Sequence, residues 1–321
     1  PMDVRSRDLY RPAGLYQPIS PSESGMLAVG DGHEIYWEVC GNPAGKPALF
    51  LHGGPGGGCY ADHRRLFDPA HYRIVLFDQR GCGRSRPVGS LSANTTQHLI
   101  ADMEKLRVML GIDKWLILGG SWGATLALLY AQRYRAHVSG LVLRGVFTAR
   151  RSEVDWLYKF GASQIFPEAW TKFVEAAPEK ERGDLVAAYY SRLTNGPREA
   201  RIAAARAWCA WEGALMTLTP RPNYDPGHGD ATLALARIET HYFINDSFLR
   251  EGEILANAGL LDGLPGVIVQ GRYDVVTPVT TAYALQALWP QARLDIVPDA
   301  GHATSEPGTI ARLVEATDSF R

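Results

Sequence analysis

The sequence predicts an α/β fold in which helices cover both faces of a mostly parallel β-sheet and an inserted helical segment interrupts that sheet. Short apolar runs such as residues 115–120 alternate with segments of helical periodicity up to about residue 148, which is typical of buried parallel strands. The alternation then stops, and it returns after residue 256; the segment between is rich in Trp, Tyr and Ala at helical spacing. We therefore expect one discontinuous sheet domain (residues 1–148 and 257–321) and a helical cap domain (residues 149–256).

The expected strands end in glycine-rich or polar loops, and the expected helices begin and end at capping residues. The helix over 94–111 has apolar residues at helical spacing from Leu99 to Leu110, candidate N-caps at its start and Gly111 as a stop. The first 35 residues are rich in Pro and Ser and only weakly periodic. Strands are expected within 33–41, 46–53, 71–85, 115–120, 138–145, 264–274 and 292–302, and further helices from about 124, over 280–289 and near 306–320.

Composition and charge exclude several functional classes. The chain has 321 residues, with 33 Lys plus Arg against 34 Asp plus Glu, so nothing favours binding to nucleic acid or to an anionic membrane. No apolar run reaches the roughly 20 residues of a membrane-spanning helix, and the polar N-terminus predicts no signal peptide. The 4 cysteines form no C-x-x-C pair, and no cluster has metal-ligand spacing. We expect a cytoplasmic protein with free thiols, no metal and no cofactor.

The stretch "LILGGSWGATLALLYAQ" (116–132) runs an apolar strand through Gly-Gly-Ser-Trp-Gly directly into an apolar helix. This G-x-S-x-G pattern is typical of a nucleophile elbow, in which flanking glycines permit a sharp, strained turn that exposes the serine hydroxyl at a helix N-terminus. A chance loop-to-helix turn is the alternative. Because the carboxyl ends of parallel strands carry the functional loops, Ser121 is the candidate nucleophile.

A serine hydroxyl needs a base and an acid that orients the base, and in this arrangement they follow the serine in the order acid, then histidine. Asp274 lies just beyond one late strand and His302 just beyond the next, so both satisfy the order. Asp299 is the one serious rival acid. Asp78 precedes the serine, and we expect it to hydrogen-bond the neighbouring "QRGCGRS" loop. Three other histidines are interpreted as structural residues: His52, His71 and His241.

Acyl transfer also requires hydrogen-bond donors for the oxyanion of the tetrahedral intermediate. The backbone N–H of Trp122, directly after the serine, is one candidate. The other is expected from the loop "LHGGPGGG" (51–58), which is similar to the HGGG-type loops of lipases and esterases. A phosphate-binding loop is excluded because the segment has neither G-K-[ST] nor G-x-G-x-x-G spacing.

Taken together and in this order, "HGGPGGG", "DQRGCGRS", "GGSWGATLAL", "GRYDVVTP" and the late "GH" resemble the motifs of the proline iminopeptidases (prolyl aminopeptidases). These are serine peptidases of the α/β-hydrolase fold that remove an N-terminal proline from peptides. The motifs span about residues 30–310, and "WCAWEGAL" and "IETHYF" extend the resemblance into the insertion. The resemblance implies peptides with an N-terminal proline as substrates.

The resemblance also implies roles for individual residues. Ser121, Asp274 and His302 would be the nucleophile, the orienting acid and the base. Gly54 and Trp122 would supply the oxyanion donors.

Four more residues match the family's substrate-binding positions. Glu212 and Glu239 would bind the charged amino terminus of the substrate; each could instead be an ordinary helix residue. Arg144 and Phe147 would form part of the pocket wall, or else serve the core or anchor a loop. Thr277 stands where many members have cysteine, which bears on the shape of the proline pocket.

Two rival interpretations remain from the sequence. A carboxylesterase or amidase of the same fold would not depend on a free amine in its substrate. A ligand-binding receptor would turn over slowly or not at all, although every catalytic part is present here.

Overall fold

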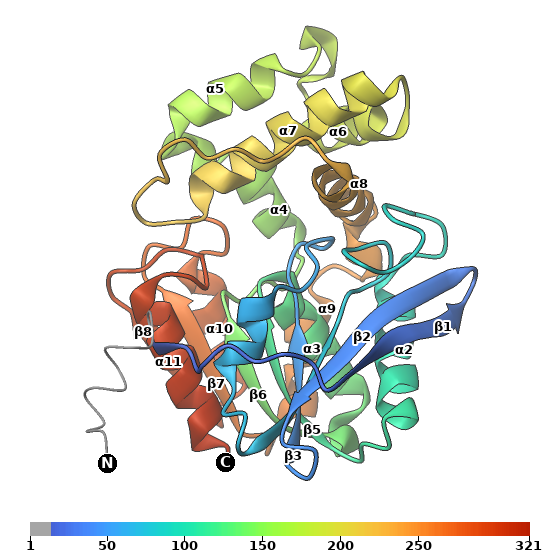
Figure 1. Cartoon of the computed structure of the whole chain (residues 1–321). Coiled ribbons are helices and arrows are strands. Elements are labelled where there is room, and N and C mark those ends of the chain that lie inside the picture. Colours follow the sequence, from blue (N-terminus) through green and yellow to red (C-terminus); the bar gives the residue numbers. More distant parts are fainter. Residues whose placement is uncertain (1–13) are drawn as a thin grey trace.

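A computed structural model of the protein describes residues 14–321 (Figure 1). The polar N-terminus from which we predicted no signal peptide, and the first residues of the expected sheet domain, lie outside these residues. One eight-stranded sheet organises the described chain, in the order β1-β2-β4-β3-β5-β6-β7-β8. β1 and β2 pair antiparallel, as do β2 and β4, and the remaining pairs are parallel. The strands are β1 (Glu23–Gly30), β2 (His33–Gly41), β3 (Lys46–Leu51), β4 (Tyr72–Phe77), β5 (Trp115–Gly120), β6 (Val138–Arg144), β7 (Gly266–Gly271) and β8 (Ala292–Val297).

The central strands are apolar throughout because both faces of the sheet are buried. In β5, Trp115 and Ile117 belong to one hydrophobic core, whereas Leu116 and Leu118 belong to the other. Successive side chains of a strand point to opposite faces, so a continuous apolar run is what a sheet between two cores requires. The predicted mostly parallel sheet is confirmed.

Helices on the two faces complete these cores. α11 (Pro307–Ser319) contributes to the core on one face, and α2 (Thr96–Met109), α3 (Trp122–Arg133) and α10 (Val279–Leu288) contribute to the core on the other. The predicted helix start near residue 94 is confirmed at Thr95, whose side chain accepts a hydrogen bond from the His98 N–H. Gly111 follows the end of α2 with φ +65°, a conformation that glycine adopts without strain.

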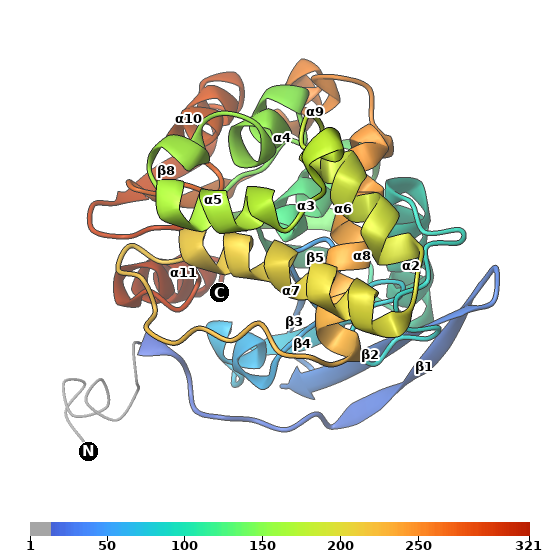
Figure 2. The same ribbon diagram turned by 90° about the horizontal axis from the view of Figure 1, so that it is seen from above.

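All helices between β6 and β7 belong to the insertion, and Figures 1 and 2 show α4 to α8 stacked over one end of the sheet. Aromatic side chains form the interior of this layer: Tyr158 stacks on Trp208 at 4.4 Å, and Phe173 stacks on Tyr189 at 4.6 Å between ring centroids. The Trp- and Tyr-rich composition therefore builds an aromatic interior for this layer, continuous with the hydrophobic core on one face of the sheet. The helices of the layer are α4 (Arg151–Tyr158), α5 (Pro167–Glu175), α6 (Leu185–Thr194), α7 (Arg198–Leu215) and α8 (Asp230–Ile244). The short α9 (Glu253–Ala256) follows them and lies beside α3, where the Gln132 side chain donates to the Ile254 carbonyl at 2.9 Å.

One strand was not predicted from the sequence. β1 lies in the segment judged weakly periodic, and it pairs with β2 at the edge of the sheet. Its side chains are mostly exposed or half-buried, so the apolar pattern is faint. The signal that could have revealed it is the turn Asp31-Gly32, where both residues have positive φ (56° and 77°) as a tight two-residue hairpin requires.

No helix within residues 14–321 combines the length and apolar character needed to cross a membrane. All 4 cysteines are free thiols, as predicted.

Candidate active site

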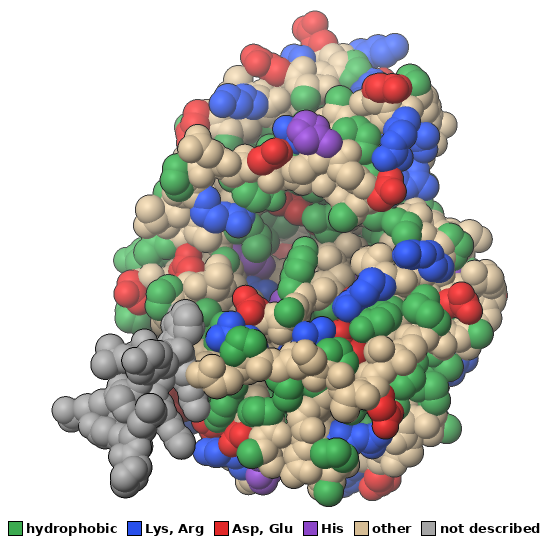
Figure 3. Space-filling view, in the orientation of Figure 1, with side chains coloured by type: hydrophobic (Ala, Val, Ile, Leu, Met, Phe, Trp, Pro, Cys, Tyr) green, Lys and Arg blue, Asp and Glu red, His purple; other side chains and the backbone are tan. Residues whose placement is uncertain are grey.

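A cavity of about 450 Å³ lies between the helical insertion and the strand ends of the sheet. The face of the molecule in Figure 3 is hollowed between these two layers. The cavity is lined by nearly all of the residues predicted for the site: Gly54, Ser121, Arg144, Phe147, Glu212, Glu239 and His302. Residues far apart in the sequence thus meet around one cavity.

Ser121 lies in the turn between β5 and α3 with φ 55° and ψ −119°, a strained conformation for a residue with a side chain. Its N–H donates to the Arg144 carbonyl at 2.8 Å, and its carbonyl accepts from the Ala124 N–H at 2.9 Å. These bonds hold the turn in place, and the side chain faces the cavity. The strained turn expected of G-x-S-x-G is confirmed.

The glycines beside Ser121 are required by close backbone contacts. A Cβ on Gly119 would lie 2.2 Å from the Gly123 carbonyl oxygen, and a Cβ on Gly123 would lie 2.1 Å from the Leu51 carbonyl oxygen. Neither carbonyl belongs to a flexible side chain that could move away. Helix α3 can therefore start directly above the strand only because both positions lack a side chain.

Replacing Gly123 by alanine is expected to lower the free energy of unfolding by about 3 kcal/mol, the upper end of overpacking costs. The added methyl group must displace either β3 or the first turn of α3. Urea-induced unfolding measures this change. Gly259→Ala is the matched control, because nothing lies within 4 Å of a Cβ there. Equal stability of the two variants would contradict the packing argument.

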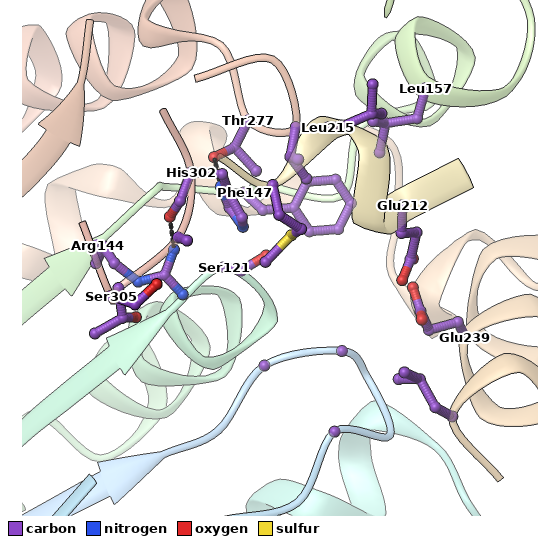
Figure 4. Close-up of a pocket in the computed structure, with 18 of the residues that line it drawn as sticks. Ser121, Arg144, Phe147, Leu157, Glu212, Leu215, Glu239, Thr277, His302 and Ser305 are labelled. Carbon is purple, nitrogen blue, oxygen red and sulfur yellow. Dashed lines mark hydrogen bonds between the residues drawn. The ribbon is translucent and has the colours of Figure 1, made fainter. Parts of the chain in front are cut away.

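Asp274 and His302 come together from the loops after β7 and β8. His302 Nδ1 lies 2.8 Å from Asp274 Oδ2, and both side chains are buried. Asp274 Oδ1 accepts the N–H groups of Val276 at 2.9 Å and of Thr277 at 2.8 Å. An acid placed at Nδ1 leaves the opposite ring nitrogen, Nε2, free to accept a proton. In Figure 4 the His302 and Ser121 side chains lie at the same end of the cavity, away from Glu212 and Glu239.

The rival acid Asp299 and the buried His52 take no part in the Asp274–His302 pair. Asp299 is exposed. Asp78 accepts the N–H groups of Cys59 at 2.8 Å and Arg84 at 2.9 Å, so its expected role in holding the adjacent loop is confirmed. His52 accepts the Gln79 N–H at Nε2, at 3.0 Å, and burial lowers its pKa.

The glycine loop after β3 is held against the start of α3. Gln79 donates from its amide to the His52 carbonyl at 3.0 Å and accepts from the Trp122 indole N–H at 3.0 Å. The Trp122 backbone N–H is at the first position of α3, where N–H groups have no partner within the helix. Gly54 borders the same cavity. The two predicted oxyanion donors thus lie on segments that one glutamine side chain ties together.

The far side of the cavity from the catalytic-triad candidates carries two carboxyl groups. Glu212 on α7 and Glu239 on α8 point toward one another (Figure 4). The Tyr158 hydroxyl donates to Glu212 Oε1 at 3.2 Å, whereas Glu239 Oε1 is buried without a hydrogen-bond partner among the described residues. Burial raises the pKa of both carboxyls, and the charge of Glu212 raises that of Glu239 further. Two acidic groups at such a site favour a cationic ligand or a retained proton.

Arg144 and Phe147 border the cavity, and each also packs against its surroundings. Arg144 Nη1 donates to the His302 carbonyl at 2.6 Å, and burial lowers the pKa of its guanidinium to about 10. The Phe147 ring meets Phe243 edge to face at 6.1 Å between centroids. The two interpretations offered from the sequence, pocket wall and structural anchor, are therefore compatible at both positions.

Three cavity features could not be inferred from motifs. Tyr158 reaches Glu212 only through packing within the insertion. Leu157 and Leu215 add apolar wall on the side of the insertion, and helical periodicity alone marks them as core. The Thr277 side chain joins the Asp274–His302 pair, although the sequence pointed only to its effect on pocket shape.

Comparisons with known proteins identify the family. The profile of the alpha/beta hydrolase fold family matches residues 46–309. A proline iminopeptidase of Xylella fastidiosa (strain Temecula1) is 52% identical over 309 residues, covering 95% of this chain and 99% of the relative. The Arabidopsis thaliana proline iminopeptidase is 50% identical, covering 96% of this chain and 82% of the relative. The Neisseria gonorrhoeae one is 46% identical, covering 95% and 98%.

Solved structures of distant relatives share the fold. An alpha/beta fold family hydrolase from Bacillus anthracis superposes with a TM-score of 0.63 at 16% identity, covering 94% of this chain and all of that one. An esterase from Exiguobacterium antarcticum superposes with a TM-score of 0.62 at 18% identity, covering 93% and 99%. The sheet order, the profile match and the full-length sequence identity agree, and the chain belongs to the proline iminopeptidase family of the α/β-hydrolase fold.

Proposed function

We propose that the protein is a serine exopeptidase that releases an N-terminal proline from peptides through an ester between the prolyl group and Ser121. The observation that carries this proposal is a pair of carboxyl groups, from buried Glu239 and half-buried Glu212, in the same cavity as Ser121 and His302. An esterase acting on neutral substrates has no use for two desolvated acids. An exopeptidase must bind a cationic amino terminus, and charge-assisted hydrogen bonds in a water-poor cavity do so strongly.

In the first half of the reaction, His302 Nε2 takes the proton of the Ser121 hydroxyl as the oxygen attacks the prolyl carbonyl. Asp274, bonded to Nδ1 at 2.8 Å, keeps the imidazole in the required tautomer and stabilises the imidazolium. The N–H groups of Gly54 and Trp122 bind the oxyanion. His302 then protonates the leaving amine, so the peptide departs one residue shorter.

In the second half, water takes the place of the leaving amine. His302 accepts a proton from that water as its oxygen attacks the prolyl ester, and the tetrahedral intermediate is held by the same two N–H groups. Collapse of this intermediate returns the proton from His302 to Ser121 and releases free proline.

Recognition of proline follows from the number of N–H groups on its nitrogen. The protonated amino terminus of proline is a secondary ammonium with two N–H bonds, and two facing carboxyl groups offer one acceptor to each. The pyrrolidine ring then lies between the carboxyl pair and Ser121, beside Phe147 and the apolar residues Leu157 and Leu215. Residues 149–256 act in this scheme as a cap domain that supplies the acidic end of the cavity, over a catalytic domain of residues 1–148 and 257–321.

Steady-state hydrolysis of proline β-naphthylamide tests the proposal when it is compared with the N-acetylated compound and with alanine β-naphthylamide. We expect fast turnover of the free proline compound, with the acetylated compound reduced at least about 100-fold in kcat/KM through loss of a charge-assisted contact. Equal turnover of the acetylated compound would refute the exopeptidase and leave an amidase or esterase that uses the same serine.

A further inference from the structure

Thr277 lies three residues after Asp274, in the loop that leads into α10, and it is 3% exposed. Its Oγ1 is 3.0 Å from Asp274 Oδ2 and 3.2 Å from His302 Nδ1. The hydroxyl therefore stands within hydrogen-bond reach of both members of the acid–base pair. The mechanism described above makes no use of it.

The donors and acceptors of this group can be assigned. Asp274 accepts only, because its carboxylate is the partner of His302, so the Thr277 hydroxyl donates its proton to Oδ2. The His302 Nδ1–H donates to the same Oδ2. The Thr277 hydroxyl oxygen is a second acceptor for this N–H, at a longer distance. With two backbone N–H groups on Oδ1, the carboxylate receives four donors, and each of its oxygens receives two.

The position of the hydroxyl is itself tightly determined. The Thr277 N–H donates to Asp274 Oδ1 at 2.8 Å, and its carbonyl accepts from the Gln270 side-chain amide at 2.8 Å, so the backbone is held on both sides. A β-branched side chain has few χ1 choices. At the end of β6, a Cβ on Gly145 would lie 3.0 Å from both Thr277 Oγ1 and His302 Cε1, which shows how closely the backbone packs over the two side chains.

We propose that Thr277 is a positioning residue: its hydroxyl bonds Asp274 Oδ2 and thereby holds the carboxylate and, through it, the His302 ring in the orientation that Ser121 requires. The inference rests on the proposed function, because positioning has meaning only for a working Ser121–His302–Asp274 triad. Without the hydroxyl, Oδ2 keeps a single donor in a buried setting. The carboxylate can then turn about its last bond, and the imidazole follows it.

The test compares Thr277→Val, which keeps the shape and removes the donor, with Thr277→Ser, which keeps the donor. For proline β-naphthylamide we expect Thr277→Val to lower kcat about tenfold with little change in KM, as for loss of one hydrogen bond to a charged group. Thr277→Ser should restore kcat to within about threefold of the parent. Thr309→Val is the matched control: this buried threonine has no hydrogen-bond partner for its hydroxyl among the described residues.

A spectroscopic readout separates positioning from general damage. The proton on His302 Nδ1 gives a far-downfield NMR signal when it is held against a carboxylate, and we expect Thr277→Val to move or broaden it while Thr277→Ser and Thr309→Val leave it in place. Beside the Asp274–His302 pair lies the Arg144 guanidinium, which donates to the His302 carbonyl. The substitutions leave the side chains of Asp274, His302 and Arg144 unchanged in sequence. If Thr277→Val does not fold, Thr277→Ala is compared with Thr277→Ser in its place.

Parent-like kcat and an unchanged signal in Thr277→Val would overturn the inference. That result is distinguishable from failure of the proposed function, which would show as parent protein that hydrolyses the acetylated substrate equally well, or as activity that survives loss of Ser121. A loss of kcat in Thr277→Ser as large as in Thr277→Val would also overturn it, because the effect would then come from packing and not from the hydroxyl.

Discussion

Ser121→Ala is expected to lower kcat for proline β-naphthylamide on the order of 10⁶-fold, as removal of the nucleophile does in comparable triads. The hydroxyl is the atom that forms the acyl-enzyme, and His302 and Asp274 have no function in hydrolysis without it. The fold should survive, since alanine keeps the Cβ that already tolerates φ 55° at this turn. Thermal unfolding of the variant should therefore match that of the parent.

The control is Ser305→Ala, because Ser305 lines the same cavity and has no part in the proposed chemistry. Figure 4 places it near the Arg144 guanidinium. This variant should retain the parent kcat within a few fold. Substantial activity in Ser121→Ala, beyond traces of contaminating enzyme, would show that another group performs the nucleophilic attack.

Glu239→Gln and Glu212→Gln are each expected to raise KM for proline β-naphthylamide about 100-fold, with a smaller effect on kcat. Each substitution removes one negative charge from the end of the cavity that would bind the amino terminus, and a charge-assisted hydrogen bond there is worth about 1.5–3 kcal/mol. The acetylated substrate carries no cation, so its slow hydrolysis should change little. Glu175→Gln, on the exposed surface of α5, is the control for removing a charge from the same layer.

Glu239→Gln should also stabilise the substrate-free protein against unfolding at high pH. Burial raises the pKa of Glu239 in the folded state, and the charge of Glu212 adds to the rise. The folded state therefore holds this proton more tightly than the unfolded chain does, and stability falls as the pH rises above the ordinary glutamate range. Glutamine has no such proton to lose. The midpoint of thermal unfolding of Glu239→Gln should exceed that of the parent near pH 8 and approach it near pH 4.

If a substitution weakens substrate binding and raises the stability of the fold, the replaced group serves function at a cost in stability. If Glu239→Gln instead lowered the unfolding midpoint near pH 8 and left KM unchanged, the Glu239 carboxyl would be a structural group. The proposal that Glu212 and Glu239 bind the substrate would then be wrong.

Much of the fold could be predicted from local sequence. The bounds of β2 and β5 were predicted to the residue, because β2 alternates between apolar and polar residues and β5 is an apolar run that ends in glycine. The elbow at Ser121 was recognisable from consecutive residues, although its glycines answer contacts of two kinds: Gly119 faces the first turn of α3, whereas Gly123 faces the neighbouring strand β3. β1 was not predicted, because this edge strand buries little apolar surface and its sequence therefore shows only a weak alternation of apolar and polar residues.

Chain order alone selected Asp274 and His302 as candidates, because parallel strands bring their carboxyl ends to one edge of the sheet. Only the tertiary structure decided between Asp274 and Asp299 as the orienting acid. The loop after β7 carries the Asp274 carboxyl to 2.8 Å from the ring nitrogen, whereas the backbone at Asp299 leaves that side chain at the surface.

The sequence by itself therefore determined seven of the eight strands, the presence of a helical insertion, the serine turn and the order of the catalytic candidates, since each leaves a pattern in consecutive residues or in the order of the chain. Only the tertiary structure decided that Glu212 and Glu239 face each other across the cavity from Ser121, and that the Thr277 hydroxyl meets Asp274 and His302. Those arrangements depend on how α7 packs against α8 and on how two separate loops meet. The free energy of such contacts comes from burial shared between distant segments, which no local pattern of residues records.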